Sequence, residues 1–198
     1  MEPPNGDRAH PTAMAIRRAA AELFIERSPS SVSLRQIADR AGVNYGLIHH
    51  YFRTKEALLG EVFADFSARG ADLIAEAPSV REAMATFLPP EGASSYSRML
   101  AWAVLDGARA EQFHQSPAFQ RIRELVEREW RDAGVRPTDV AIDSHLVTAA
   151  AMATILGWRF FQPFLAAAGE LGDRDEGAAA AEVIELLSVM IRAVAEHP

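Results

Sequence analysis

Residues 33–55 read SLRQIADRAGVNYGLIHHYFRTK and predict two short helices joined by a tight turn. Ser33 can cap the first helix, Gly42 supplies the left-handed backbone that ends it, and Asn44 can cap the second helix. The apolar residues at helical spacing are Ile37, Ala38 and Ala41 in the first segment and Ile48, Tyr51 and Phe52 in the second. This pattern is typical of a helix-turn-helix, in which the second helix can lie in the major groove of DNA.

The remainder of the chain predicts more helices and no strands, so the expected fold class is all-α. An apolar stripe predicts a helix over residues 11–27, with Thr12 as its cap, that closes a three-helix bundle with the helix-turn-helix. Capping residues and prolines predict that the later helices occupy residues 55–75, 79–88, 94–112, 116–134, 138–166 and 178–195. Pro163 should kink or end the helix that contains it.

Composition limits the classes of function that fit. The chain has 198 residues, no cysteine and a net charge of −7, which excludes disulfides, a thiol nucleophile and a thiolate metal site. Residues 1–60 nevertheless carry a net charge of about +2, so the positive charge lies with the helix-turn-helix. No apolar run is long enough to span a bilayer and the N-terminus is polar, so we expect a cytoplasmic protein with no membrane partner.

Residues 11–60 resemble the DNA-binding domain of the TetR family of bacterial transcriptional regulators. The matching text is Ile37-Ala38, Ala41-Gly42-Val43, Gly46, Tyr51-Phe52 and Lys55-Glu56-Ala57-Leu58-Leu59. The resemblance implies a homodimeric repressor that binds a palindromic DNA operator and is released by a small molecule. It implies a DNA-binding domain at 11–55 and a lever helix leading into a larger helical ligand-binding and dimerisation domain at 56–198. Residues 1–10 are polar and carry two prolines, so we expect them to form a mobile arm.

The polar residues of the helix-turn-helix are the candidates for contacts with DNA. Ser33, Asn44 and Lys55 lie at helix N-termini, where free N–H groups favour phosphate, and the family pattern supports Lys55. Gly46 allows close approach to the DNA backbone. The hydroxyl of Tyr51 either contacts phosphate or serves only to fill the core.

Base edges are the expected targets of Tyr45, Leu47, His49 and His50. Leu47 and His49 stand where many family members have a small hydroxyl residue and a tyrosine. Leu47 cannot donate a hydrogen bond but could contact a thymine methyl group. A metal site at His49 and His50 is disfavoured, because neighbours on a helix point about 100° apart and no third ligand is near. No metal or cofactor is therefore expected.

Large apolar side chains in the middle helices are the candidates for a ligand pocket. They are Phe63, Phe66, Met84, Phe87, Met99, Trp102 and Trp130. Their spacing predicts burial, whereas the cavity itself is implied by the resemblance, and its apolar lining favours a largely apolar effector. Asp106, Arg109 and His145 could orient a polar group or could simply be solvated. The residues assigned to the dimer interface, in the last two long helices, are Trp158, Phe161, Leu187, Met190 and Ile191.

Three other functions were considered, and the sequence does not support them equally. An enzyme is disfavoured, because Asp143, Ser144 and His145 are merely adjacent on a helix and do not form a triad. A non-specific DNA binder would need a far more basic chain. A family member that has lost operator binding, and that binds a small molecule or a protein partner instead, stays open because of Leu47 and His49.

Overall fold

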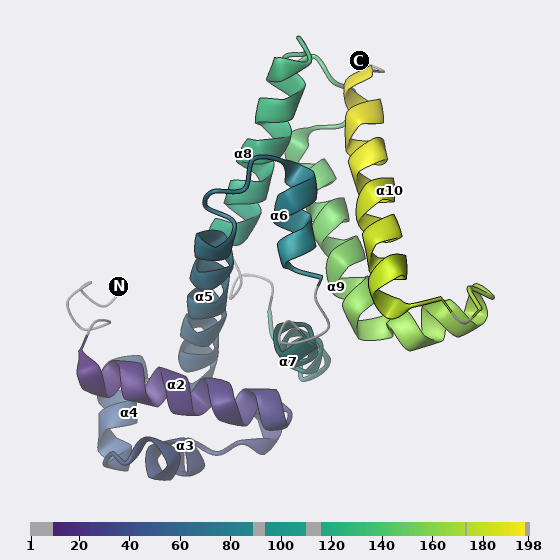
Figure 1. The fold of residues 1–198 in the computed structure, drawn as a ribbon. Coiled ribbons are helices and arrows are strands. Elements are labelled where there is room, and N and C mark those ends of the chain that lie inside the picture. Colours follow the sequence, from purple (N-terminus) through teal and green to yellow (C-terminus); the bar gives the residue numbers. More distant parts are fainter. Residues whose placement is uncertain (1–9, 89–93, 110–115, 173, 197–198) are drawn as a thin grey trace. The chain divides into compact units, whose positions relative to one another are not determined.

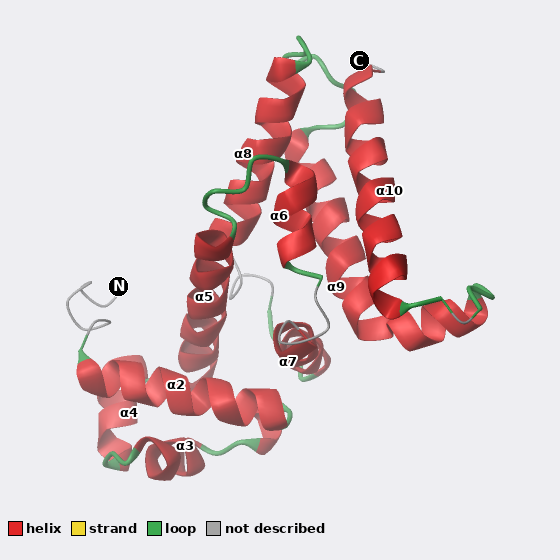
Figure 2. Cartoon of the chain, in the orientation of Figure 1, coloured by secondary structure: helices red, strands yellow, loops and turns green. Residues whose placement is uncertain are grey.

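The structure is a computed structural model that describes residues 10–88, 94–109, 116–172 and 174–196. Every regular element in these residues is a helix and none is a strand (Figure 2), so the predicted all-α fold class is confirmed. None of the helices formed by these residues is long and apolar enough to cross a membrane. The chain divides into two compact units, which we call the head unit (Met1–Phe66 and Arg98–Gln115) and the body unit (Ser67–Ser97 and Ser116–Pro198).

The head unit is built around the predicted helix-turn-helix. Its helices are α2 (Pro11–Glu26), the short 3-10 helix η1 (Pro29–Ser31), α3 (Leu34–Ala41), α4 (Tyr45–Phe52), the start of α5 (Lys55–Leu73) and the end of α7 (Ser94–Leu105) (Figure 1). Its fully buried apolar side chains include Ile16, Ala20, Phe24, Ile37, Ile48, Leu58, Met99 and Ala103. Each large apolar side chain so buried stabilises the fold by about 1.5–3 kcal/mol, so α2 holds α3 and α4 together as expected.

The first helix begins differently from the prediction. His10, rather than Thr12, is its N-cap: the Nδ1 atom of His10 accepts a hydrogen bond from the backbone N–H of Thr12 at 3.2 Å. Pro11 then occupies the first helical position, where its missing N–H costs nothing. Thr12 therefore lies inside the helix, and the prediction that it caps α2 is wrong.

The body unit packs four helices around its own core. They are α6 (Val80–Thr86), α8 (Pro117–Asp132), α9 (Ser144–Ala168) and α10 (Glu176–Glu196), and the end of α5 joins them (Figure 1). Trp130 lies at the centre with 1% of its surface exposed, and its indole Nε1–H donates to the carbonyl oxygen of Ile191 at 3.0 Å. This bond ties α8 to α10 and satisfies the one polar group of a buried tryptophan.

Two predicted helix boundaries are wrong. The long helix begins at Ser144, not Thr138, because Asp143 caps it by accepting from the N–H groups of His145 at 2.8 Å and Leu146 at 3.0 Å. The helix predicted over residues 94–112 ends at Leu105. Gly107 follows with φ of +85°, a conformation that only glycine adopts readily and that turns the chain out of the helix.

Pro163 does not end α9, which continues to Ala168. Proline cannot donate to the carbonyl four residues earlier, so it weakens the helix without necessarily terminating it. The C-terminal part of α9 runs in a different direction from the rest (Figure 1). Of the two predicted outcomes, kink or end, the second is wrong, because Pro163 lies inside α9.

Candidate nucleic-acid interface

Side-chain caps fix the turn between α3 and α4. The N–H of Gln36 donates to Ser33 Oγ at 3.2 Å, and the N–H of Ser33 donates to Gln36 Oε1 at 2.9 Å, which forms a complete capping box. Gly42 ends α3 with φ of +67°. Asn44 then caps α4 by accepting from the N–H of Gly46 at 2.9 Å. The three capping roles predicted for Ser33, Gly42 and Asn44 are confirmed.

Helix α4 has a buried side and an exposed side. Ile48 is fully buried and Phe52 is 7% exposed, so these two anchor the helix in the head unit. The four residues expected to contact base edges, Tyr45, Leu47, His49 and His50, are all exposed. Their exposure is what contact with DNA requires, and the contact itself stays a prediction.

Tyr45, His49 and Arg53 form a chain of hydrogen bonds along α4. His49 Nε2 lies 2.9 Å from the Tyr45 hydroxyl, and His49 Nδ1 lies 3.0 Å from the carbonyl oxygen of Arg53. The two rings meet edge to face, with centroids 5.0 Å apart. Arg53 has φ of +62°, unusual for a residue other than glycine, and its N–H bonds to His49 O at 3.2 Å. Both nitrogens of His49 are thus engaged within the protein.

Tyr51 is held against the start of α2. Its hydroxyl lies 2.9 Å from His10 Nδ1, and its ring also packs edge to face against His50, with centroids 4.9 Å apart. Nδ1 of His10 carries no hydrogen when it accepts from Thr12, so the Tyr51 hydroxyl is the donor in this contact and the two donors share one lone pair. Tyr51 is only partly exposed. The structure favours a packing role for Tyr51 over the phosphate contact that was left open beside it.

Lys55 has partners that the sequence did not suggest. Its Nζ donates to three carbonyl oxygens, those of Pro29 at 2.9 Å, Val32 at 3.1 Å and Ser30 at 3.4 Å. An ammonium group has three donors, so all of them are engaged in holding η1. A phosphate contact through this ammonium would require at least one of these bonds to be exchanged, which makes Lys55 a structural residue in this conformation.

Asp106 clamps the same turn from the end of α7. Its carboxylate accepts from Ser28 Oγ at 2.5 Å, from the N–H of Ser30 at 2.9 Å and from Ser30 Oγ at 3.0 Å. Desolvation raises the pKa of Asp106, but these hydrogen bonds and the charge of Lys55 outweigh it, so the net pKa lies below the ordinary value. Asp106 and Arg109, for which a ligand contact or simple solvation was left open, line a cavity of about 330 Å³ in the head unit together with Lys55.

Arginine side chains supply the positive charge of this surface. Arg40 lies 3.4 Å from both Glu22 and Glu26, so its charge is partly neutralised. Arg35 and Arg53 are exposed and form no ion pair within the residues that the structure describes. These two were not among the predicted DNA contacts. Arg35 lies in the first turn of α3 and Arg53 directly follows α4, and a contact of either with phosphate is a prediction.

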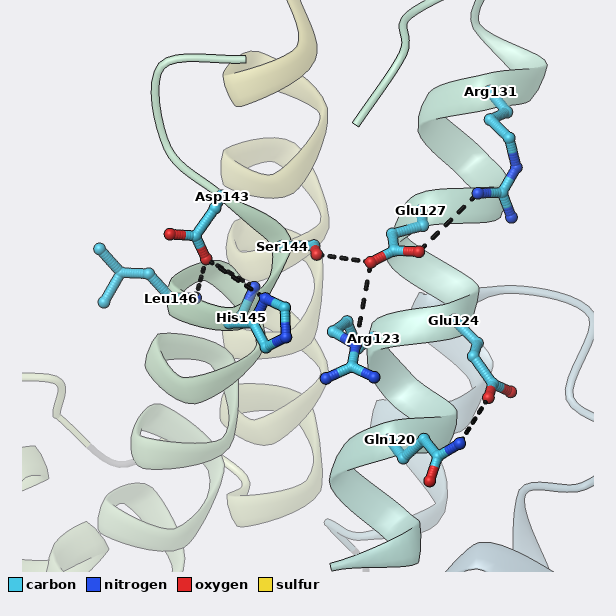
Figure 3. A network of polar contacts seen from close by, with 9 residues as sticks. All are labelled: Gln120, Arg123, Glu124, Glu127, Arg131, Asp143, Ser144, His145 and Leu146. Carbon is cyan, nitrogen blue, oxygen red and sulfur yellow. Dashed lines mark hydrogen bonds and ion pairs between the residues drawn. The ribbon is translucent and has the colours of Figure 1, made fainter. Parts of the chain in front are cut away.

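The adjacent Asp143, Ser144 and His145 have structural roles. Ser144 is buried, and its hydroxyl donates to Glu127 on α8 at 2.6 Å (Figure 3). Asp143 caps α9, and the exposed His145 lies with Nδ1 3.7 Å from the Asp143 carboxylate. The hydroxyl of Ser144 thus joins α9 to α8 through the carboxylate of Glu127. That carboxylate also lies 3.8 Å from both Arg123 and Arg131.

The predicted pocket residues divide between the units. Phe63, Phe66, Met99 and Trp102 belong to the head unit, whereas Met84, Phe87 and Trp130 belong to the body unit. Phe63, Met84, Met99 and Trp130 are buried, as their spacing predicted. That they line a ligand pocket stays a prediction.

The residues assigned to the dimer interface differ in exposure. Phe161 is 50% and Met190 54% exposed. Leu187 and Ile191 are instead buried in the core of their own body unit, and Trp158 packs against that core. Leu187 and Ile191 therefore offer little surface to a second copy, because α10 turns these two inward.

Comparisons with known proteins agree with this geometry. Residues 16–62 match the family described as bacterial regulatory proteins, tetR family. The HTH-type transcriptional repressor Rv3405c of Mycobacterium tuberculosis is 36% identical over 160 residues, covering 79% of this chain and 76% of that protein. The fold resembles Salmonella enterica GusR (TM-score 0.64, 18% identity, 95% of this chain and 97% of that chain). It also resembles Bacillus subtilis FadR in complex with stearoyl-CoA (TM-score 0.58, 20% identity, covering 88% of this chain and 96% of that chain).

Proposed function

Because this chain belongs to the tetR family of bacterial regulatory proteins, we propose that it is a homodimeric repressor that binds a palindromic operator and is released by a small molecule. Family membership makes the chain a transcriptional regulator with a helix-turn-helix rather than an enzyme. The homodimer, the palindrome and the small molecule are the parts that we add.

The exposed side of α4 is the observation that carries the proposal of operator binding. Two buried anchors fix the helix, and its exposed side chains offer an apolar surface, two imidazoles and a phenol. The major groove admits an α-helix and presents a distinct pattern of donors, acceptors and methyl groups for each base pair. A short rigid helix with varied side chains on one side suits direct reading of that pattern.

Selection from random double-stranded DNA with the full-length protein tests this proposal. We expect a palindromic sequence whose half-sites are separated by about one turn of DNA, roughly 34 Å, with affinity that falls as salt rises. A footprint over a single half-site at saturation would contradict the homodimer. Absence of any enriched sequence at physiological salt would favour the alternative of a family member that no longer binds an operator.

Exposed apolar side chains on the last two helices support the homodimer. They recur at positions i, i+3 and i+4, which lie on one side of a helix: Phe161, Phe164 and Leu165 on α9, and Leu186, Val189 and Met190 on α10. Large apolar side chains that are exposed together on one side of a helix are typical of an interaction site. We assign the interface to these residues, which include the predicted Phe161 and Met190 and replace Leu187 and Ile191.

A largely apolar effector is the remaining part of the proposal. Its support is the apolar character of the predicted pocket residues, and the structurally similar FadR was solved with stearoyl-CoA. Stearoyl-CoA is therefore a suitable first probe. We expect an apolar acyl compound of this class to raise the melting temperature of the protein and to release selected DNA. If a series of such compounds does neither, the proposal of an apolar effector is wrong, whereas the proposal of operator binding still stands.

A further inference from the structure

The hydrogen-bond directions at Tyr45 follow from the partners of His49. The carbonyl oxygen of Arg53 can only accept, so Nδ1 of His49 carries the hydrogen in that 3.0 Å bond. In the neutral imidazole, Nε2 has no hydrogen and accepts, so the Tyr45 hydroxyl donates to it at 2.9 Å. The phenol oxygen of Tyr45 is then left with lone pairs and no hydrogen to give.

We infer that Tyr45, oriented by His49, recognises an amino group on a base edge, either adenine N6 or cytosine N4. This inference rests on the proposed function, because it requires α4 to enter the major groove. The only hydrogen-bond donors exposed there are these two amino groups, whereas guanine and thymine present acceptors at the equivalent positions. An oxygen that can only accept is attracted to an amino group and repelled by guanine O6, thymine O4 and phosphate oxygens.

The local backbone maintains this arrangement. Arg53 leaves α4 with φ of +62° and ψ of −51°, and its carbonyl oxygen meets the ring of His49. The N–H of Arg53 bonds to the carbonyl of His49 at 3.2 Å, so the two residues are joined twice. Tyr45 remains 42% exposed although its hydroxyl hydrogen is engaged. His49 is therefore a positioning residue and Tyr45 is the residue that contacts the base.

Base preference, measured by selection from random double-stranded DNA at constant salt, tests this assignment. For the wild-type protein we expect adenine or cytosine to be favoured over guanine or thymine by roughly 3- to 10-fold at one position of each half-site, the range of a single hydrogen bond. Tyr45→Phe keeps the ring and removes the oxygen, so this preference should fall to about 1. His49→Phe should release the hydroxyl hydrogen, and guanine or thymine should then be accepted at the same position.

Tyr51→Phe is the matched control, because it removes the same hydroxyl from a second tyrosine of α4 whose oxygen faces His10. It should leave the base preference unchanged. The inference is overturned if Tyr45→Phe keeps the wild-type preference, if the preference lost is for guanine or thymine, or if Tyr51→Phe loses it equally. Failure of the wild-type protein to select any sequence would overturn the proposed function as well, which distinguishes the two outcomes.

Discussion

The exposed side of α4 and the exposed sides of α9 and α10 differ in the kind of side chain they present. On α4, the hydroxyl of Tyr45 and both nitrogens of His49 already have partners in the helix or in Arg53 that follows it. On α10, the exposed side chains of Leu186, Val189 and Met190 are apolar and carry no N–H, O–H or C=O group that could form a directed hydrogen bond. Reading a base edge requires hydrogen-bond groups held in fixed directions, whereas joining two copies requires apolar area. The two surfaces therefore suit two different kinds of partner.

The largest expected effect separates the two sides of α4 itself. Ile48→Ala removes a fully buried side chain and should destabilise the head unit by about 2–5 kcal/mol, from lost burial and the cavity left behind. Leu47→Ala, one residue away and 37% exposed, should cost about 0.5 kcal/mol or less. Amide hydrogen exchange of α2 to α4 measures the difference. Equal costs for the two variants would contradict the burial described for α4.

The second prediction concerns the apolar face of α10. Met190→Glu places a charge among apolar contacts, where it must lose its water, so the dissociation constant of the dimer should rise by at least about 10-fold. Sedimentation equilibrium measures this change. Leu73→Glu is a suitable control, because Leu73 on α5 is also exposed, at 69%, and lies outside the proposed interface. Equal dimer strength in both variants would refute the assigned face.

A smaller effect is expected at the clamp between α7 and η1. Asp106→Asn keeps one accepting oxygen but loses the charge, so we expect a loss of about 1 kcal/mol in the stability of the head unit. Hydrogen exchange at residues 28–32 should become faster. Leu105→Asn, at the neighbouring exposed position, is the control and should leave this exchange unchanged.

The clamp should also depend on pH. Because the folded-state pKa of Asp106 lies below its ordinary value of 3.8, the carboxylate stabilises the folded state fully above that value. Its contribution is lost as the pH falls through the lower, folded-state pKa. The difference in stability between the wild-type protein and Asp106→Asn should therefore be constant near neutral pH and disappear in strong acid. A difference that grows on acidification would contradict the lowered pKa.

The smallest expected effect concerns the positive charge of Arg35, which we expect to strengthen DNA binding without distinguishing one base from another. Arg35→Ala should weaken DNA binding by a similar, modest factor on all sequences and reduce the slope of log affinity against log salt by about 1. Arg81→Ala in the body unit, where Arg81 lies 3.0 Å from Glu185, should change neither quantity. A change in base preference in Arg35→Ala would show that this arginine reads sequence rather than phosphate.

The local caps could be predicted from the sequence because their partners are two to four residues apart. Ser33, Gly42 and Asn44 were assigned in this way. The bond from the N–H of Ala57 to the hydroxyl oxygen of Thr54, at 3.1 Å, is equally local. The capping rule failed at α9, where Thr138 was expected to begin the helix. Asp143 caps it instead, and the adjacent Ser144 bonds to Glu127 on α8, a partner 17 residues away.

The partners of Lys55 and Asp106 could not be predicted in this way. Lys55 bonds to carbonyl groups 23 to 26 residues earlier in the chain, and Asp106 bonds to residues 76 and 78 positions away. Helical periodicity gives no information about such pairs, because they depend on how helices pack. The position of Lys55 at the start of α5 was correctly predicted, but its ammonium is committed to the protein.

The sequence by itself determined that this protein is all-helical, where its helix-turn-helix lies, and which side of α4 is buried. These features depend on residue spacing and on bonds within one turn of a helix, which the order of residues specifies. Only the tertiary structure decided which polar groups remain available to a partner. Hydrogen bonds to a distant segment use up the donors of Lys55, and packing against the core of the body unit buries Leu187. Both outcomes depend on how the helices pack in three dimensions.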